Sequence, residues 1–267
     1  MARGRAAERN AEHTLLAVCA ALFAASTTVT IVWSIPMAAM NGMPMPGGWT
    51  MSMTWMRMPD QTWAGAAASL LEMWVVMMVA MMMPSLVPML LRYRDAVSGD
   101  SHVRLDRMTA WVGLGYFSVW TLLGTIVLPI GLALAEVEMH YPELSRAVPL
   151  AAGAAVVFAG AAQFSAWKTR HLACCRGSIE RHQTLPVHAA GAWRHGARLG
   201  LHCVYSSVGP TAILLIMGGM DLRVMAVVTI AITAERLAPA GERVARAIGI
   251  ITVCAGALLL TRAAGLQ

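Results

Sequence analysis

Apolar residues along this chain gather in long runs separated by short polar segments. A helix that crosses a bilayer needs about 20 such residues, at about 1.5 Å per residue. Seven runs approach or exceed that length, at residues 14–35, 64–90, 108–135, 147–167, 198–217, 222–237 and 244–261. The sixth run is the shortest. The pattern predicts an all-α fold, a polytopic transmembrane helix bundle of about seven spans that forms a single integral membrane domain over residues 1–267.

Composition and charge agree with this prediction. Hydrophobic residues make up 58% of the chain and charged residues 13%, a balance that does not suit a soluble domain. With the N-terminus in the cytoplasm, 16 of the 20 Lys and Arg residues fall in cytoplasmic segments, as the positive-inside rule requires. The net charge of +6 is therefore a sign of membrane orientation, and we expect no nucleic-acid partner.

The chain has 21 methionines, and eight of them lie in the outer connection at residues 36–63. Prolines and glycines interrupt any regular helix in this segment. Thioether sulfur suits soft cations such as Cu(I), so the segment is a candidate copper-gathering loop. The alternative is an apolar flap of Met and Trp residues in the headgroup zone. The candidate ligands are Met37, Met40, Met43, Met45, Met51, Met53, Met56 and Met58.

A second long connection, at residues 168–197, is expected on the cytoplasmic side. It contains His171, Cys174 and Cys175 at chelate spacing, and imidazole with thiolate suits Cu(I) or Zn(II). These three residues form only half of a tetrahedral site. The alternative is that the thiols are inert and lie at a helix end.

Polar and sulfur-bearing side chains within the apolar runs mark a second candidate centre, because polar groups are costly in hydrocarbon. Counted from the cytoplasmic helix ends, several such groups reach a similar depth in the inner half of the bilayer. We expect them to converge on a metal ion. They are His202 and Cys203 of the fifth run and Met77, Met81 and Met82 of the second.

Two carboxylates are candidates for proton coupling. Glu235 lies near the inner end of the sixth run, and Glu72 lies near the outer end of the second. Glu235 precedes Arg236, so the alternative is an ion pair between these neighbours at the membrane interface.

The sequence resembles the bacterial predicted metal-binding integral membrane protein family, a domain of unknown function. The second run is similar to its W-x-x-M-x-x-A-M-M-x-P-S-x-x-P signature, and Gly200 and Cys203 fit its G-x-x-x-C stretch. Ser206 and Ser207 stand where the family commonly has a cysteine pair. The remaining resemblance lies in Lys168, Cys175, Arg176, Gly219, Met220, Met225 and Glu235. The resemblance implies a metal-binding protein of the bacterial cytoplasmic (inner) membrane.

These observations predict a membrane protein that handles a soft transition metal, most simply Cu(I), by acquisition, transport or delivery. Its expected partners are the lipid bilayer, the metal ion and a membrane or periplasmic metalloprotein. The alternative is a non-catalytic subunit or assembly partner of a larger complex, with Met used for packing. No serine nucleophile motif, phosphate-binding loop or HExxH motif is present, so we expect no enzymatic activity.

Overall fold

The computed structural model of this chain describes residues 2–40, 42–56, 61–97, 102–175, 188–217 and 221–265. Within these residues the fold is an all-α bundle with one small hairpin, which confirms the predicted fold class. The elements are α1 (Ala2–Ala39), β1 (Met43–Met45), β2 (Trp49–Met51), η1 (Met53–Trp55), α2 (Trp63–Ala96), α3 (His102–His140), α4 (Pro142–Ala162), α5 (Ala166–Cys175), α6 (Ala189–Ile216), α7 (Leu222–Leu237) and α8 (Gly241–Ala263).

Six helices of the described residues are long and apolar enough to cross a membrane, namely α1, α2, α3, α4, α6 and α8. This number fits a multi-pass membrane protein. The sixth predicted span, at residues 222–237, is helical as α7, but α7 has only 16 residues, about 24 Å at about 1.5 Å per residue, and is shorter than the hydrocarbon layer of about 30 Å. The predicted bundle of about seven spans therefore corresponds to six long apolar helices and one shorter helix within the described residues.

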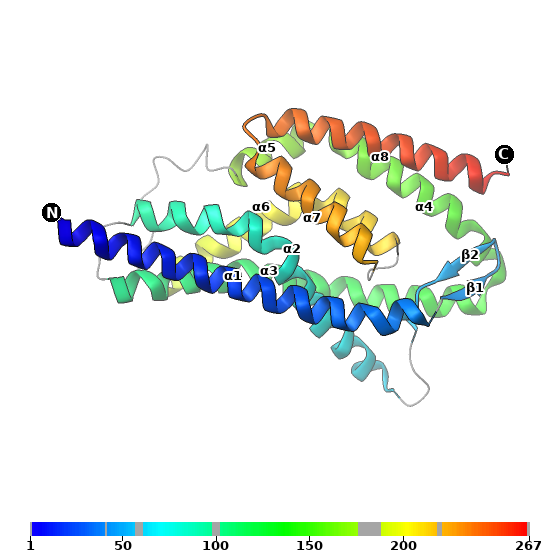
Figure 1. Cartoon of the computed structure of the whole chain (residues 1–267). Coiled ribbons are helices and arrows are strands. Elements are labelled where there is room, and N and C mark those ends of the chain that lie inside the picture. The colour runs from blue at the N-terminus through cyan, green and yellow to red at the C-terminus, as the bar shows by residue number, and fades with distance from the viewer. Residues whose placement is uncertain are drawn as a thin grey trace.

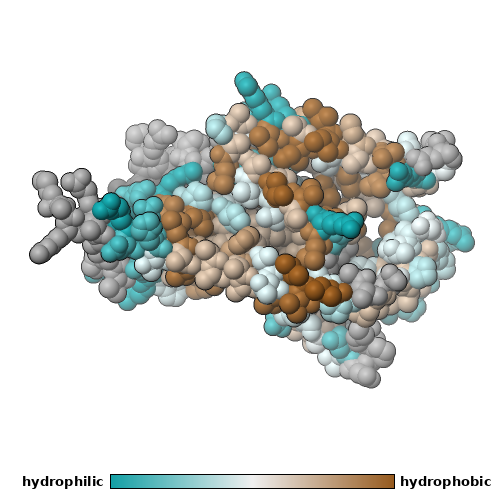
Figure 2. Space-filling model, in the orientation of Figure 1, coloured by the Kyte–Doolittle hydropathy of each residue, from teal (hydrophilic) through white to brown (hydrophobic). Residues whose placement is uncertain are grey.

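The helices are arranged around α6 and α7. Figure 1 shows α4 and α8 side by side on one flank, with α6 and α7 between this pair and α1, α2 and α3. The hairpin β1–β2 lies at the opposite end of the molecule from the N-terminus. In Figure 2, hydrophobic residues cover much of the middle of the visible face. Phe158, Ile230 and Ile251 are among the most exposed apolar side chains, as lipid-facing residues would be.

Glycines allow α3 and α6 to pack in close contact. A Cβ atom on Gly196 would lie 1.9 Å from the carbonyl oxygen of Val112, and one on Gly115 would lie 2.1 Å from that of Trp193. No larger residue fits at either position without separating the helices, and small residues of this kind are typical of membrane helix contacts. This contact fixes the position of α6, which carries His202 and Cys203.

The predicted fourth span differs from the observed helix in an informative way. The helix runs from Pro142 to Ala162, and the chain then turns and begins α5 at Ala166. The Ser165 hydroxyl accepts a hydrogen bond from the Lys168 backbone N–H at 3.1 Å, which caps the new helix. The segment predicted to begin a cytoplasmic loop at residue 168 is therefore helical as far as Cys175, and α5 packs against α6.

Methionine forms much of the core. Met77, Met78, Met81, Met82, Met83 and Met89 of α2 are all buried in the main hydrophobic cluster. An unbranched thioether fills irregular gaps between helices, and α2 contains Pro84 and Pro88 within its length. Packing is therefore one established use of methionine in this chain.

Candidate metal centre and buried ion network

Cys203 lies at the point where four helices meet. Its side chain is fully buried. The sulfur lies 2.8 Å from the Tyr116 hydroxyl of α3, 3.8 Å from the Met82 sulfur of α2 and 2.9 Å from the Arg236 guanidinium of α7. A thiol and a thioether in contact are a soft donor pair of the kind that Cu(I) favours.

Arg236 holds this centre together. One guanidinium nitrogen donates to the Ser85 hydroxyl at 2.9 Å, and the other donates to the Ser206 hydroxyl at 3.1 Å and to the Cys203 sulfur. Its side chain is buried, and a buried charge must be matched by polar partners. Arg236 therefore ties α7 to α2 and α6 at the level of Cys203.

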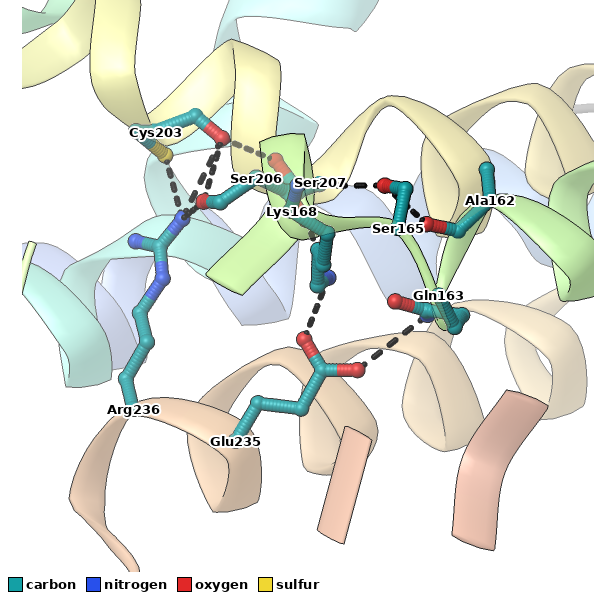
Figure 3. A network of polar contacts seen from close by, with 9 residues as sticks. All are labelled: Ala162, Gln163, Ser165, Lys168, Cys203, Ser206, Ser207, Glu235 and Arg236. Carbon is teal, nitrogen blue, oxygen red and sulfur yellow. Dashed lines mark hydrogen bonds and ion pairs between the residues drawn. The ribbon is translucent and has the colours of Figure 1, made fainter. Parts of the chain in front are cut away.

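A buried ion pair lies beside the cysteine (Figure 3). The Lys168 ammonium donates to the Glu235 carboxylate at 2.7 Å, and the Gln163 amide donates to the other carboxylate oxygen at 3.2 Å. Lys168 also donates to the backbone carbonyl of Ser206. Both charged side chains are at most 5% exposed. The pair joins α5 to α6 and α7.

The proline in α6 explains why the Ser206 carbonyl accepts a hydrogen bond from Lys168. Pro210 has no N–H, so it cannot donate to the carbonyl of Ser206 four residues earlier. A carbonyl left in this way inside a membrane protein needs another donor. Lys168 is that donor.

A pair of imidazoles lies next to the cysteine centre along α6. The Nδ1 atoms of His171 and His202 are 2.9 Å apart, a hydrogen-bond distance. Trp167 and Tyr205 pack against His171, each with a ring-centroid distance of 4.9 Å. Burial lowers the pKa of His171, and the positive charge of Arg170 lowers it further.

The structure brings the predicted inner ligands together in two groups instead of one. His202 and Cys203 are consecutive on a helix and so point about 100° apart. His202 meets His171, whereas Cys203 meets Met82. These contacts therefore do not join the predicted ligands at one point, and their convergence on a metal ion stays a prediction. Met77 and Met81 are buried in the surrounding core.

The remaining predicted ligands of the second connection lie on α5. Cys174 is half-buried, and the side chain of Cys175 lies outside the described residues. No group of three or more His, Cys, Asp or Glu side chains placed to hold a metal occurs in the described part of the chain.

The two carboxylates occupy different settings. Glu235 is buried and pairs with Lys168, so the alternative of an interfacial Glu235–Arg236 ion pair is wrong. Neighbouring residues on a helix point in different directions, which is why Arg236 turns toward Cys203. Glu72 is exposed on α2. The proton-coupling role of both stays a prediction.

The middle of the methionine-rich segment, at residues 43–51, forms a β-hairpin. Met43 pairs with Met51 and Met45 with Trp49 across two antiparallel strands, and η1 follows. Met45 and Met51 are buried against Ala135, Trp49, Trp55, Met56 and Met139. The Trp49 indole donates to the Ser145 carbonyl at 3.0 Å, which fixes the hairpin to α4.

The hairpin methionines therefore differ in environment. Met40 and Met43 are exposed, Met37 and Met53 are half-buried, and the Met37 sulfur accepts a hydrogen bond from Thr54 at 3.6 Å. Met58 lies outside the described residues. Met45 and Met51 therefore pack against protein, and both interpretations of the segment, the copper-gathering loop and the apolar flap in the headgroup zone, stay predictions.

Sequence reasoning missed the roles of Lys168, Arg236, Tyr116 and Gln163. Lys168 and Arg236 were grouped with the cytoplasmic basic residues, because the positive-inside rule counts charges without regard to burial. One signal was present. Lys168 is the only lysine among 20 basic residues, which sets this position apart from the other basic positions.

Comparisons with known proteins agree with a copper role. A protein-family model described as PpoB2, copper chaperone, matches residues 71–259. The match covers most of α2 and all of α3 to α7, and therefore the Cys203 centre and the His171–His202 pair, but not the hairpin. Searches of curated proteins and of solved structures found no match.

Proposed function

Because this chain belongs to the PpoB2 copper chaperone family, we propose that it is a membrane copper-handling protein that binds Cu(I) inside its helix bundle and delivers it to a partner. The observation that carries the proposal is the contact between the Cys203 and Met82 sulfurs at 3.8 Å. Both residues lie within the family match. The proposed role involves binding and transfer, with no catalytic step.

The chemistry of the centre supports Cu(I) over a harder ion. Thiolate and thioether select Cu(I), whereas Mg²⁺ and Ca²⁺ take oxygen ligands. Copper binds cysteine as the thiolate, and the charges of Cu⁺ and thiolate cancel, so the metal adds no net charge to the buried centre. Arg236, 2.9 Å from the sulfur, retains Ser85 and Ser206 as hydrogen-bond acceptors when copper takes the sulfur.

The two imidazoles extend the proposed route. His171 and His202 lie on the α5 side of Cys203 and are half-buried, whereas Cys203 is fully buried. We assign the imidazoles to copper exchange with the surroundings and the sulfurs to retention. The Cys174 and Cys175 thiols at the end of α5 are the proposed next ligands toward the cytoplasm.

The orientation and direction of transfer are part of the proposal. Basic residues gather toward the N-terminal side of the membrane, which supports a cytoplasmic N-terminus in a bacterial inner membrane. The hairpin then faces the periplasm, where Met40 and Met43 expose thioethers. Neutral thioethers outside and charged thiolates inside favour inward movement of Cu(I), toward a metalloprotein partner.

Copper content of the purified protein tests the proposal. The protein is loaded with Cu(I) under reducing conditions in lipid nanodiscs and analysed for copper by elemental analysis. We expect stoichiometric copper in the wild type and in Cys254→Ser, a control at an exposed cysteine on α8. Cys203→Ser and Met82→Leu should each contain less copper than the wild type. Full copper in both of these variants overturns the assigned site.

A second function is favoured by one observation, the burial of six α2 methionines in the core. In that case the chain is a non-catalytic membrane subunit or assembly partner, and methionine serves packing alone. Wild-type protein that binds no copper under these conditions, yet co-purifies with a membrane complex, supports this function.

A further inference from the structure

The short helix α5 carries two residues that face α6 one turn apart. Lys168 reaches Glu235 and the Ser206 carbonyl, and His171 reaches His202. We propose that Lys168 is a positioning residue, whose ion pair with Glu235 seats α5 so that His171 and His202 form a two-imidazole copper site. This inference rests on the proposed function.

The two acceptors that hold the Lys168 ammonium lie on two other helices, α6 and α7. Pro210 leaves the Ser206 carbonyl without its helical donor, and Glu235 places a carboxylate beside it, held by the Gln163 amide. A lysine ammonium, with three donors on a flexible stem, can serve both acceptors. Residues 202 and 206 share a face of α6, as residues 168 and 171 do on α5. The two contacts therefore run side by side between the helices.

Water has little access to the Lys168–Glu235 ion pair. The crevice between α4, α5 and α6 that reaches Lys168 and Ser206 has a volume of about 10 Å³ and is walled by Trp167, Tyr205 and Gly209. This is room for about one water molecule. An ion pair in such a place is screened far less than one at a surface, so it is a firm anchor.

The helix α5 depends on contacts with its neighbours, such as the Lys168–Glu235 ion pair, for its position. It has 10 residues, which is too short for an isolated helix to be stable in water, and it is not one of the helices long enough to cross a membrane. Without Lys168, His171 would no longer be held opposite His202, and the copper site would lose its second imidazole.

Copper binding requires a small movement at the pair. A metal ion takes each imidazole nitrogen at about 2.0 Å, so two nitrogens on opposite sides of an ion lie about 4 Å apart. The observed separation is 2.9 Å. The copper-free pair is closed by a hydrogen bond, and copper opens it while Lys168 keeps α5 in place.

The test isolates the imidazole site in a Cys203→Ser background, in nanodiscs, at about pH 7.5, above the ordinary histidine pKa of about 6.5. Cu(I) affinity is measured by competition with a chromophoric Cu(I) chelator, and X-ray absorption counts the nitrogen ligands. Lys168→Met with Glu235→Leu removes both charges together. We expect affinity to fall about 10- to 100-fold, as for loss of other groups that orient metal ligands, and one nitrogen ligand to be lost.

Two further variants keep the test informative. Arg194→Met removes a charge from the exposed side of α6, away from the proposed ligands, and should leave affinity unchanged. Pro210→Ala gives the Ser206 carbonyl a backbone donor that competes with Lys168, and it should weaken copper binding less than the double variant. If the double variant or Pro210→Ala folds, by its thermal unfolding midpoint, and binds copper as the background does, the positioning role is overturned.

The outcomes separate this inference from the proposed function. Copper bound through sulfur in the wild type, with none bound in the Cys203→Ser background, overturns the imidazole site and leaves the Cys203 centre standing. No copper in either protein removes both.

Discussion

The Cys203 sulfur lies 3.8 Å from the Met82 sulfur, although the two residues are 121 positions apart in the sequence. Contact between them depends on α2 and α6 both packing against α3 and α7. Arg236 binds the Cys203 sulfur and Ser85, three residues beyond Met82, and so fixes both helices at this level. The donor pair is therefore formed in advance by the fold.

The buried ion pair gives a stability prediction. Glu235→Gln leaves the Lys168 charge buried without its carboxylate, which should cost about 3–5 kcal/mol of unfolding free energy. The combined Lys168→Met and Glu235→Leu exchange should cost much less, because apolar residues often replace a buried pair without loss. Reversible unfolding in mixed micelles measures both. Equal losses in the two proteins would contradict this account of the network.

The exposed hairpin methionines should contribute to copper uptake, and the buried ones should not. Met45→Leu with Met51→Leu keeps the packing volume and should leave copper uptake by vesicles unchanged. Met40→Leu with Met43→Leu removes the exposed thioethers and should lower the initial rate of radioactive copper uptake. Equal uptake by all three proteins would remove the acquisition role of the hairpin.

A substitution at Gly47 tests whether the same hairpin is packed against α4. Gly47 has φ of +103°, and a Cβ atom there would lie 3.0 Å from the Arg146 Cα. Gly47→Val should therefore strain the turn by about 1–3 kcal/mol and loosen the hairpin from α4. Hydrogen exchange of residues 43–51 should rise. Gly48 also has a positive φ, of +77°, but nothing lies within 4 Å of an added Cβ, so Gly48→Ala strains the backbone alone and should have a smaller effect. Unchanged exchange in Gly47→Val would argue against the docked hairpin.

Acid should release copper from the imidazole pair only at low pH. Protons compete with copper for imidazole, and burial and Arg170 both lower the pKa of His171 from its ordinary value of 6.5. In the Cys203→Ser background, release should therefore begin below the pH expected for an ordinary histidine. Arg170→Met removes the second cause, so its release should shift to higher pH. Superimposable copper-release curves would contradict this role of Arg170.

Restored cysteines should strengthen the inner site. The Ser206 and Ser207 hydroxyls both donate to the Cys203 carbonyl, at 3.0 and 2.6 Å. Both side chains therefore lie close to Cys203. Ser206→Cys with Ser207→Cys should raise Cu(I) affinity in chelator competition, because thiolate is a stronger soft ligand than hydroxyl. Ser69→Cys, at an exposed position on α2, is the control. An equal gain in this control would show that the effect does not depend on position.

The sequence predicted the helical architecture because long apolar runs have few other solutions in a membrane. It also placed the second-run methionines and Cys203 at a similar depth, and Met82 and Cys203 are in contact. It did not place His202 in a separate pair, because depth along a helix says nothing about the side of the helix that a residue faces. The side that His202 and Cys203 each face became clear only from the packing of α5 and α7 on α6.

The charges were the hardest feature to predict. Lys168 follows an apolar run and precedes a polar segment, which is the pattern of an exposed loop residue. Its burial depends on the turn after Ala162, on the carbonyl left by Pro210 and on Glu235, 67 residues away. No local pattern contains these three conditions together.

X-ray absorption at the copper edge of the Cu(I)-loaded wild type tests the central claim most directly. Sulfur scatterers should be present, and both Cys203→Ser and Met82→Leu should reduce their number, whereas Cys254→Ser should not. A spectrum with only nitrogen and oxygen neighbours, or sulfur neighbours that persist when Cys203 and Met82 are both replaced, would contradict copper binding at this centre.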